Sequence, residues 1–143
     1  MKKENPDWHA DFPLREDVED FSGKARTFLI DCHETALGFT VRAQEQCVEN
    51  GYEFAAYSET SPYSALGRVR QKMYRELATR HITGAPGGYR MLHDSLSGRI
   101  TSDDDGGVLL VVDGVPLSLE EIGSILVSRE GWSFELQITD SLG

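Results

Sequence analysis

The stretch from Ser61 to His81, SPYSALGRVRQKMYRELATRH, decides the fold. Serine followed by proline is typical of a helix start, because serine caps free N–H groups and proline is tolerated in the first turn. At about 100° per residue, one arc of about 140° collects the apolar side chains. These are Tyr63, Leu66, Val69, Met73, Tyr74 and Leu77. The stretch therefore predicts a helix with one apolar face packed on a sheet.

The solvent side of this helix carries a basic stripe. Arg68, Lys72 and Arg75 fall within about 60° of each other on the helical wheel. Exposed charge rows are ordinary and pair with a protein's own acids, so a solvated face is one interpretation. The other is a docking stripe for an acidic protein partner, or for the chain's own acidic amino-terminal segment. Both interpretations remain open from the sequence.

Arg70 differs from the stripe because it projects inside the apolar arc, between Leu77 and Tyr63. An unpaired guanidinium there would cost several kcal/mol. We expect an internal ion pair or a hydrogen-bonded anchor, with a ligand clamp as the alternative. Together with Arg68, Lys72 and Arg75 it completes the set of candidate binding residues.

Before the helix, the sequence predicts three strands. An apolar run within Lys24–Asp31 is followed by alternation in Leu37–Ala43, and the alternation resumes over Tyr52–Ala56. Asn50-Gly51, between the last two, is the strongest short turn signal in the chain. The three strands are expected to form an antiparallel meander.

After the helix, the glycine-rich residues 84–88 predict a linker. Gly98–Ser102 is a candidate strand, and Val108–Val112 is a continuous apolar run of the kind found in buried strands. Asp113-Gly114 predicts a turn.

Ser118, with Glu121 three residues later, is a capping box that predicts a short helix. Trp132–Thr139 then alternates apolar and polar residues as a half-buried strand does. The expected order is βββαββαβ, an α+β fold with a mainly antiparallel sheet and two helices packed on one face.

The 143-residue length suits one domain, which we expect over residues 21–143. Residues 1–20 hold seven acids against three bases and show no helical or strand period, so they predict an acidic arm, either mobile or laid across a surface. They contain no apolar stretch typical of a secretory signal. Two cysteines are too few for a disulfide framework, and we expect a cytoplasmic protein.

The segment Gly98–Asp140 resembles the carboxy-terminal part of a family of uncharacterised bacterial domains of unknown function. The shared pattern is an acidic-glycine loop, an apolar strand, an Asp-Gly turn, a capped helix, Gly-Trp and an alternating strand. Residues 51–82 resemble the family more loosely. The resemblance implies a bacterial cytosolic source and a shared fold. It implies no catalytic residue, cofactor or activity.

Candidate chemical motifs in the sequence fail their templates. Asp103–Asp105 lacks the ligands at both ends of a calcium-binding loop, and the loop at residues 84–88 lacks the Lys-[Ser/Thr] of a phosphate-binding loop. Cys32 and His33 are adjacent, so on an extended chain they point to opposite faces and are poorly placed as a catalytic pair. We expect no catalytic residue, no metal site and no cofactor.

The net charge of −10 argues against non-specific binding to nucleic acid or to an anionic membrane. The function we favour is a non-catalytic protein-interaction or regulatory module, with an acidic protein, its own amino-terminal arm or a second copy in a homodimer as partner. The alternative is a small-molecule or nucleotide-binding domain that uses a pocket between sheet and helices, with Arg70 and Tyr52, Tyr57 or Tyr63 at its rim. The third is an enzyme without a recognisable motif.

Overall fold

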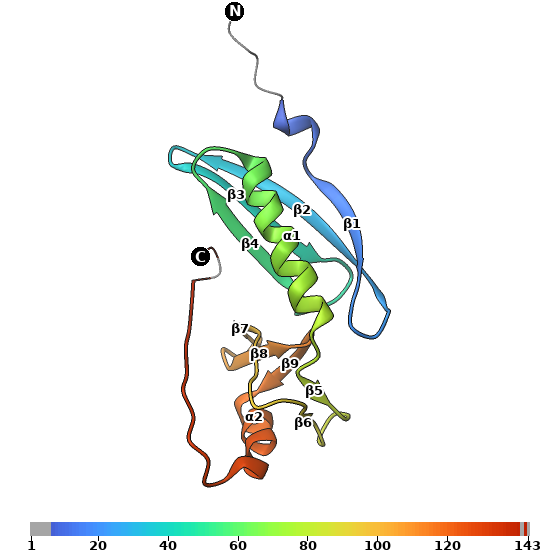
Figure 1. The fold of residues 1–143 in the computed structure, drawn as a ribbon, viewed down its shortest axis with the longest axis vertical. Coiled ribbons are helices and arrows are strands. Elements are labelled where there is room, and N and C mark those ends of the chain that lie inside the picture. The colour runs from blue at the N-terminus through green and yellow to red at the C-terminus, as the bar shows by residue number, and fades with distance from the viewer. Residues whose placement is uncertain (1–6, 141, 143) are drawn as a thin grey trace, which may run out of the picture.

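The computed structural model describes residues 7–140 and 142. Mainly antiparallel sheets with two α-helices confirm the α+β class (Figure 1). The strands are β1 (Leu14–Glu19), β2 (Ala25–Thr35), β3 (Gly38–Glu45), β4 (Glu53–Ser58), β5 (Ile82–Thr83), β6 (Arg90–Met91), β7 (Arg99–Ser102), β8 (Val108–Val112) and β9 (Val115–Ser118). The α-helices are α1 (Pro62–Ala78) and α2 (Leu119–Leu126), and the 3-10 turns are η1 (Trp8–Ala10) and η2 (Val127–Arg129).

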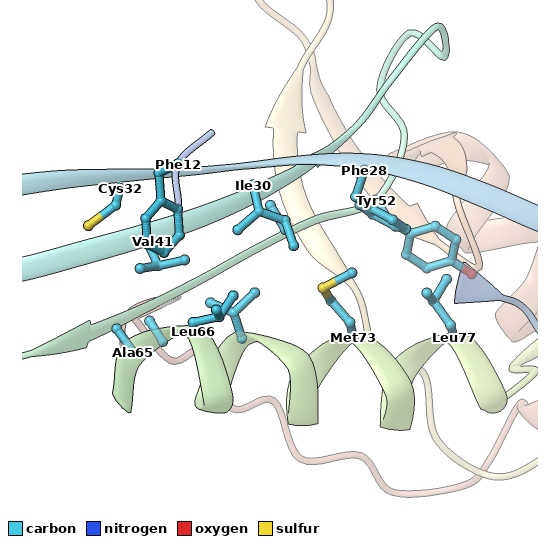
Figure 2. Close-up of a cluster of buried hydrophobic side chains, with 13 residues drawn as sticks. Phe12, Phe28, Ile30, Cys32, Val41, Tyr52, Ala65, Leu66, Met73 and Leu77 are labelled. Atoms are coloured by element: carbon cyan, nitrogen blue, oxygen red, sulfur yellow. The ribbon is translucent and has the colours of Figure 1, made fainter. Parts of the chain in front are cut away.

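The first half is a four-stranded antiparallel meander, in the order β1-β2-β3-β4, with α1 across one face (Figure 1). Ser61 caps α1 as predicted, accepting from the N–H groups of Tyr63 and Ser64. Figure 2 shows the helix side chains directed at those of the strands. The fully buried large residues of this core are Phe28, Ile30, Val41, Val69, Met73 and Leu77. The predicted apolar face thus forms, except that Tyr63 and Tyr74 lie at its rim.

The arm predicted over residues 1–20 needs correction. Residues 1–6 lie outside the described residues, but Leu14–Glu19 is the edge strand β1, paired with β2 from Leu14 opposite Ile30 to Glu19 opposite Ala25. Its inward positions are Leu14, Glu16 and Val18. Because Glu16 is charged, the strand's alternation of apolar and polar residues is not visible in the sequence. The acid is tolerated at this inward position because Arg70 of α1 pairs with it at 2.8 Å.

A charged group is buried where β1 turns into β2. Arg26 donates to Asp20 through Nε at 2.8 Å and to Glu45 through Nη1 at 2.9 Å, and its guanidinium lies over the Tyr52 ring. Only 1% of the Asp20 side chain is exposed. Burial by itself would raise the pKa of Asp20, but hydrogen bonds from Ser22, Arg26 and the Lys24 N–H outweigh it and lower the pKa from 3.8 to about 2.

This lowered pKa predicts an acid-sensitive stability. A carboxyl that titrates lower in the folded state stabilises the fold above its unfolded pKa, so the contribution of Asp20 is complete above about pH 4 and is lost as the pH falls toward 2. The full contribution is about 2 kcal/mol. Urea unfolding between pH 5 and pH 2 should show this loss in the wild type and a flatter profile in Asp20→Asn. Asp104→Asn, in an exposed loop, should keep the wild-type profile; equal slopes in all three would contradict the assignment.

The second half has its own buried cluster. The sheet β7-β8-β9 and the two-stranded β5-β6 pack with α2 around Val112, Leu117 and Ile125. The buried residues thus form two clusters, one in each half, and the single domain expected over residues 21–143 stays a prediction. The expected packing of both helices on one sheet face is wrong, because α1 covers the first sheet and α2 packs on β8 and β9.

The last predicted strand does not form. Trp132–Thr139 runs extended along the molecule (Figure 1), assigned to no helix or strand. Its alternate apolar side chains are exposed: Trp132 by 62%, Phe134 by 90%, Leu136 by 74% and Ile138 by 67%. The pattern specifies a strand only where an edge is available, and no strand of the described chain pairs with it. The short strand β9, between the Asp113-Gly114 turn and α2, was not predicted.

Candidate functional site

A cleft of about 890 Å³ lies between the two halves of the chain and the extended carboxy-terminal segment. The first half contributes β4 and the outer side of α1, and the second half contributes β7, β8 and α2. Residues 136–140 form its far wall. The wall residues used below are Arg42, Tyr52, Glu53, Lys72, Arg75, Glu76, Gly98, Arg99, Ile100, Leu110, Asp113, Leu119 and Ile122.

One wall of the cleft is apolar. Ile100 of β7 lies opposite Leu110 of β8, which lies opposite Leu117 of β9, so the three share a sheet face. Leu117 is buried in the core under α2, but Ile100, at the edge of the sheet, is 56% exposed. Leu119 of α2, 58% exposed, and Ile122 extend this surface. The core of the second half therefore opens into the cleft at the β7 edge.

The opposite wall is charged. Lys72, Arg75 and Glu76 line the cleft from α1. Arg42 and Glu53 line it from β3 and β4, on the sheet face away from α1. The Lys72 ammonium donates to the Ala55 carbonyl at 2.7 Å. Burial, and then the neighbouring charges of Arg68 and Arg75, lower the pKa of Lys72. The first-half side of the cleft therefore carries charges of both signs.

At the base of the cleft, Arg99 joins the two halves. It donates to the Gly51 carbonyl at 2.6 Å, and Glu53 lies 3.8 Å from its guanidinium. Its Nε and the Tyr52 hydroxyl are buried without a hydrogen-bond partner in the described part of the chain. Burial, and then the charge of Asp113, raise the pKa of Tyr52. These two groups leave hydrogen-bonding capacity at the floor of the cleft.

Asp113 ties the second half to the end of α1. Its carboxylate accepts from the backbone N–H groups of His81 and Ile82 at 2.8 and 2.9 Å, and it lies 2.9 Å from His81 Nδ1. Asp113 and Gly114 both have positive φ, 55° and 77°, so the predicted turn forms with its residues in the left-handed region. A side chain at Gly114 would strike the Tyr52 ring at 2.9 Å.

The four predicted binding residues do not form one site. Lys72 and Arg75 lie in the cleft, while Arg68 donates to the Tyr57 carbonyl at 2.6 Å. The ion pair predicted for Arg70 is confirmed: its partner is Glu16, which also accepts from the Tyr74 hydroxyl. Glu16 belongs to the predicted acidic arm, so β1 meets α1 through Arg70 and not through the stripe. As ligand-binding residues, all four stay predictions.

The sequence reasoning missed the other contributors to the cleft. Arg42, Arg99 and Leu119 are far apart in the chain, and only the packing of the halves brings them together. The sequence did contain one signal for the cleft. Apolar and polar residues alternate over Trp132–Thr139, which indicates a segment that pairs with a strand.

The remaining polar motifs lie outside the cleft. Cys32 is buried and His33 is exposed, as expected for neighbours on a strand. Burial, and then the charges of Asp31 and Glu34, raise the pKa of the Cys32 thiol. Asp103 accepts from the N–H groups of Asp105 and Gly107 within its own loop. Across residues 7–140 and 142, no three His, Cys, Asp or Glu side chains gather as a metal site. No helix in this range is long and apolar enough to cross a bilayer.

Comparison with protein families divides the chain between its two cores. Residues 10–78 match a family described as a domain of unknown function (DUF7686), and residues 81–142 match another domain of unknown function (DUF7713). The first match spans the meander and α1, and the second spans the remaining strands, α2 and the extended segment. No curated protein and no solved structure matches the chain.

Proposed function

We propose that this chain, which joins a domain from each of these two families of unknown function, is a non-catalytic interaction module that binds a protein partner through residues 132–139. The observation that carries the proposal is the exposure of four alternating apolar side chains on one extended segment, up to 90% at Phe134. Burying a large apolar side chain gains about 1.5–3 kcal/mol. Binding of a partner that buries several of these side chains is therefore strongly favoured by the hydrophobic effect.

The mode of binding that fits this segment is β-strand addition. Backbone groups of an extended segment without a ladder are free to pair with another chain, and alternate side chains then give specificity. The segment borders a cleft that also exposes β7, the edge strand of the second sheet. Edge strands are natural templates for an added strand.

The charged groups around the cleft support binding over catalysis. Arg99 is held by Gly51 and Glu53, and Asp113 is occupied by His81 and Ile82. These contacts join the two halves, and the rest of the cleft surface holds apolar side chains together with charged residues of both signs. The proposal keeps the bacterial cytoplasmic setting expected from the sequence.

Site-specific photo-cross-linking tests this proposal. A benzophenone amino acid in place of Phe134 should give one discrete adduct in cells, because the side chain enters the interface. The same group at Asp104, in an exposed loop of the same half, should give none. The Phe134 adduct should disappear when Leu136→Glu is added, since a charge there opposes burial. An unlinked chain at position 134, or an adduct that survives Leu136→Glu, would contradict strand addition by this segment.

A further inference from the structure

We propose that the partner of residues 132–139 is a second copy of this chain, and that two copies exchange these segments. Each segment would lie between β7 of the other copy and the other copy's segment. The joined sheet would contain three strands and one segment from each copy, eight strands in the order β9-β8-β7-segment-segment-β7-β8-β9. This inference rests on the proposed function, because it names the partner of the same segment.

The space beside β7 is large enough for one added strand. The cleft has residues 98–100 on one side and residues 136–140 of the same chain on the other, so the chain's own segment forms a wall and leaves the interior open. A strand residue in a sheet occupies about 4.8 × 10 × 3.3 Å, or about 160 Å³. The cleft of about 890 Å³ therefore takes about five or six residues of one added strand.

The apolar face of residues 132–139 matches the apolar wall of the cleft. A strand added at the β7 edge would lay alternate side chains over Ile100 and beside Leu119 and Ile122, where the core of the second half is open. The segment offers four apolar residues at this period: Trp132, Phe134, Leu136 and Ile138. One face of the segment thus matches the apolar wall of the cleft.

The charge of residues 130–140 is complementary to arginines that line the cleft. These residues contain three acids, Glu130, Glu135 and Asp140, and no base. With the apolar residues directed at α2, Glu135 lies on the opposite face of the added strand, toward the first half, where Arg75 of α1 and Arg42 of β3 line the cleft. The two acids on that side already have partners, since Glu53 lies 3.8 Å from Arg99 and Glu76 lies 3.9 Å from His81 Nδ1. Each copy therefore carries both an acidic segment and two arginines on the side of the cleft that receives it.

The exchange produces a closed, two-fold symmetric dimer. If each segment enters the other copy's cleft, a two-fold axis between the two segments relates the copies, and the same contacts occur twice. Each β7 gains a neighbour on its open edge, and each segment gains a neighbour on both edges. No strand edge created by the exchange is left to recruit a third copy.

Oligomeric state tests the exchange directly. By sedimentation velocity at micromolar concentration, the purified wild-type chain should be a dimer. Leu136→Glu and Glu135→Pro should weaken self-association by about 100-fold or more, because one charges the apolar face and the other removes a ladder N–H. Leu37→Glu is the matched control, since Leu37 is 79% exposed on the β2–β3 turn of the other half, and it should stay dimeric.

Folding of these variants is checked by the far-ultraviolet circular dichroism spectrum and by exchange protection of α1 amides. Both should match the wild type, because residues 133–139 pair with no strand of the described chain and lie outside both cores. A wild-type monomer at all concentrations, or a Glu135→Pro chain that stays dimeric, would overturn the exchange.

A cysteine scan identifies the segments as neighbours. In a Cys47→Ser background, single cysteines are placed at positions 133 to 139. Across a two-fold axis between antiparallel strands, one residue lies opposite its own copy within disulfide reach, so one position should cross-link far faster than the rest. Uniformly slow cross-linking along the segment would reject segment pairing.

The two proposals fail in different ways. If the Phe134 adduct has the mass of a different protein and the purified chain is a monomer, strand addition stands and the homodimer is rejected. If no adduct forms and the chain is a monomer, both are rejected. An adduct with the mass of two copies, lost with Leu136→Glu, supports both.

Discussion

Replacing Arg26 with methionine is expected to lower the free energy of unfolding by about 3–5 kcal/mol, the range for removing one partner of a buried ion pair. Arg26 is the single cation that bridges Asp20 and Glu45, whose side chains are only 1% and 3% exposed. Methionine fills much of the space but leaves two carboxylates close together and out of contact with water. Their mutual repulsion and lost solvation oppose folding.

Equilibrium urea unfolding measures this effect. Arg15→Met is the matched control, since Arg15 occupies an exposed position of β1, and it should change the free energy of unfolding by less than about 0.5 kcal/mol. Adding Asp20→Asn and Glu45→Gln to Arg26→Met should recover part of the loss, because the unpaired charges are removed. A loss below 1 kcal/mol for Arg26→Met alone would show that the acids find other partners.

Replacing Asp113 with alanine is expected to cost about 3 kcal/mol or more, because it leaves buried N–H groups without an acceptor. The carboxylate accepts from His81 and Ile82 backbone groups and contacts the His81 ring. Alanine also disfavours the positive φ of 55° at this position, which aspartate and asparagine tolerate better. Both causes act where the chain leaves α1 and enters the second half.

Two further substitutions separate these causes. Asp113→Gly accepts the positive φ and loses the acceptors, so it should retain most of the cost. Asp113→Asn keeps one acceptor oxygen and should cost less than either. Hydrogen exchange at the Ile82 amide measures whether the chain after α1 stays bonded to residue 113. We expect its protection to fall most in the alanine variant. Unchanged protection in all three would mean that Asp113 does not hold the junction.

Local patterns in the sequence were reliable where a short-range interaction sets the structure. The Ser61 cap, the apolar face of α1, the Asp113-Gly114 turn and the capping box at Ser118 all form as predicted. Each depends on hydrogen bonds or backbone angles within a few residues. The ion pair of Arg70 was predictable for a similar reason, because a charge inside an apolar arc must find a partner.

The errors came from long-range pairing. β1 was missed because Glu16 interrupts its inward face, and it is acceptable only beside Arg70, which is 54 residues away. Trp132–Thr139 was predicted as a strand, and no strand of the described chain pairs with it. The cleft could not be predicted from the sequence for the same reason. Its walls come from both halves, which meet through long-range contacts such as Arg99 with Gly51.

By itself the sequence determined the α+β class, the two helices, their caps and the strand-like pattern of residues 132–139. These follow from side-chain periodicity and local hydrogen bonding, which act along the chain. Only the tertiary structure decided that α1 and α2 cover different sheets, that a cleft opens between them, and that residues 132–139 pair with no strand of the described chain. Whether an alternating segment becomes a strand depends on a free edge within reach, and an edge belongs to the folded sheet.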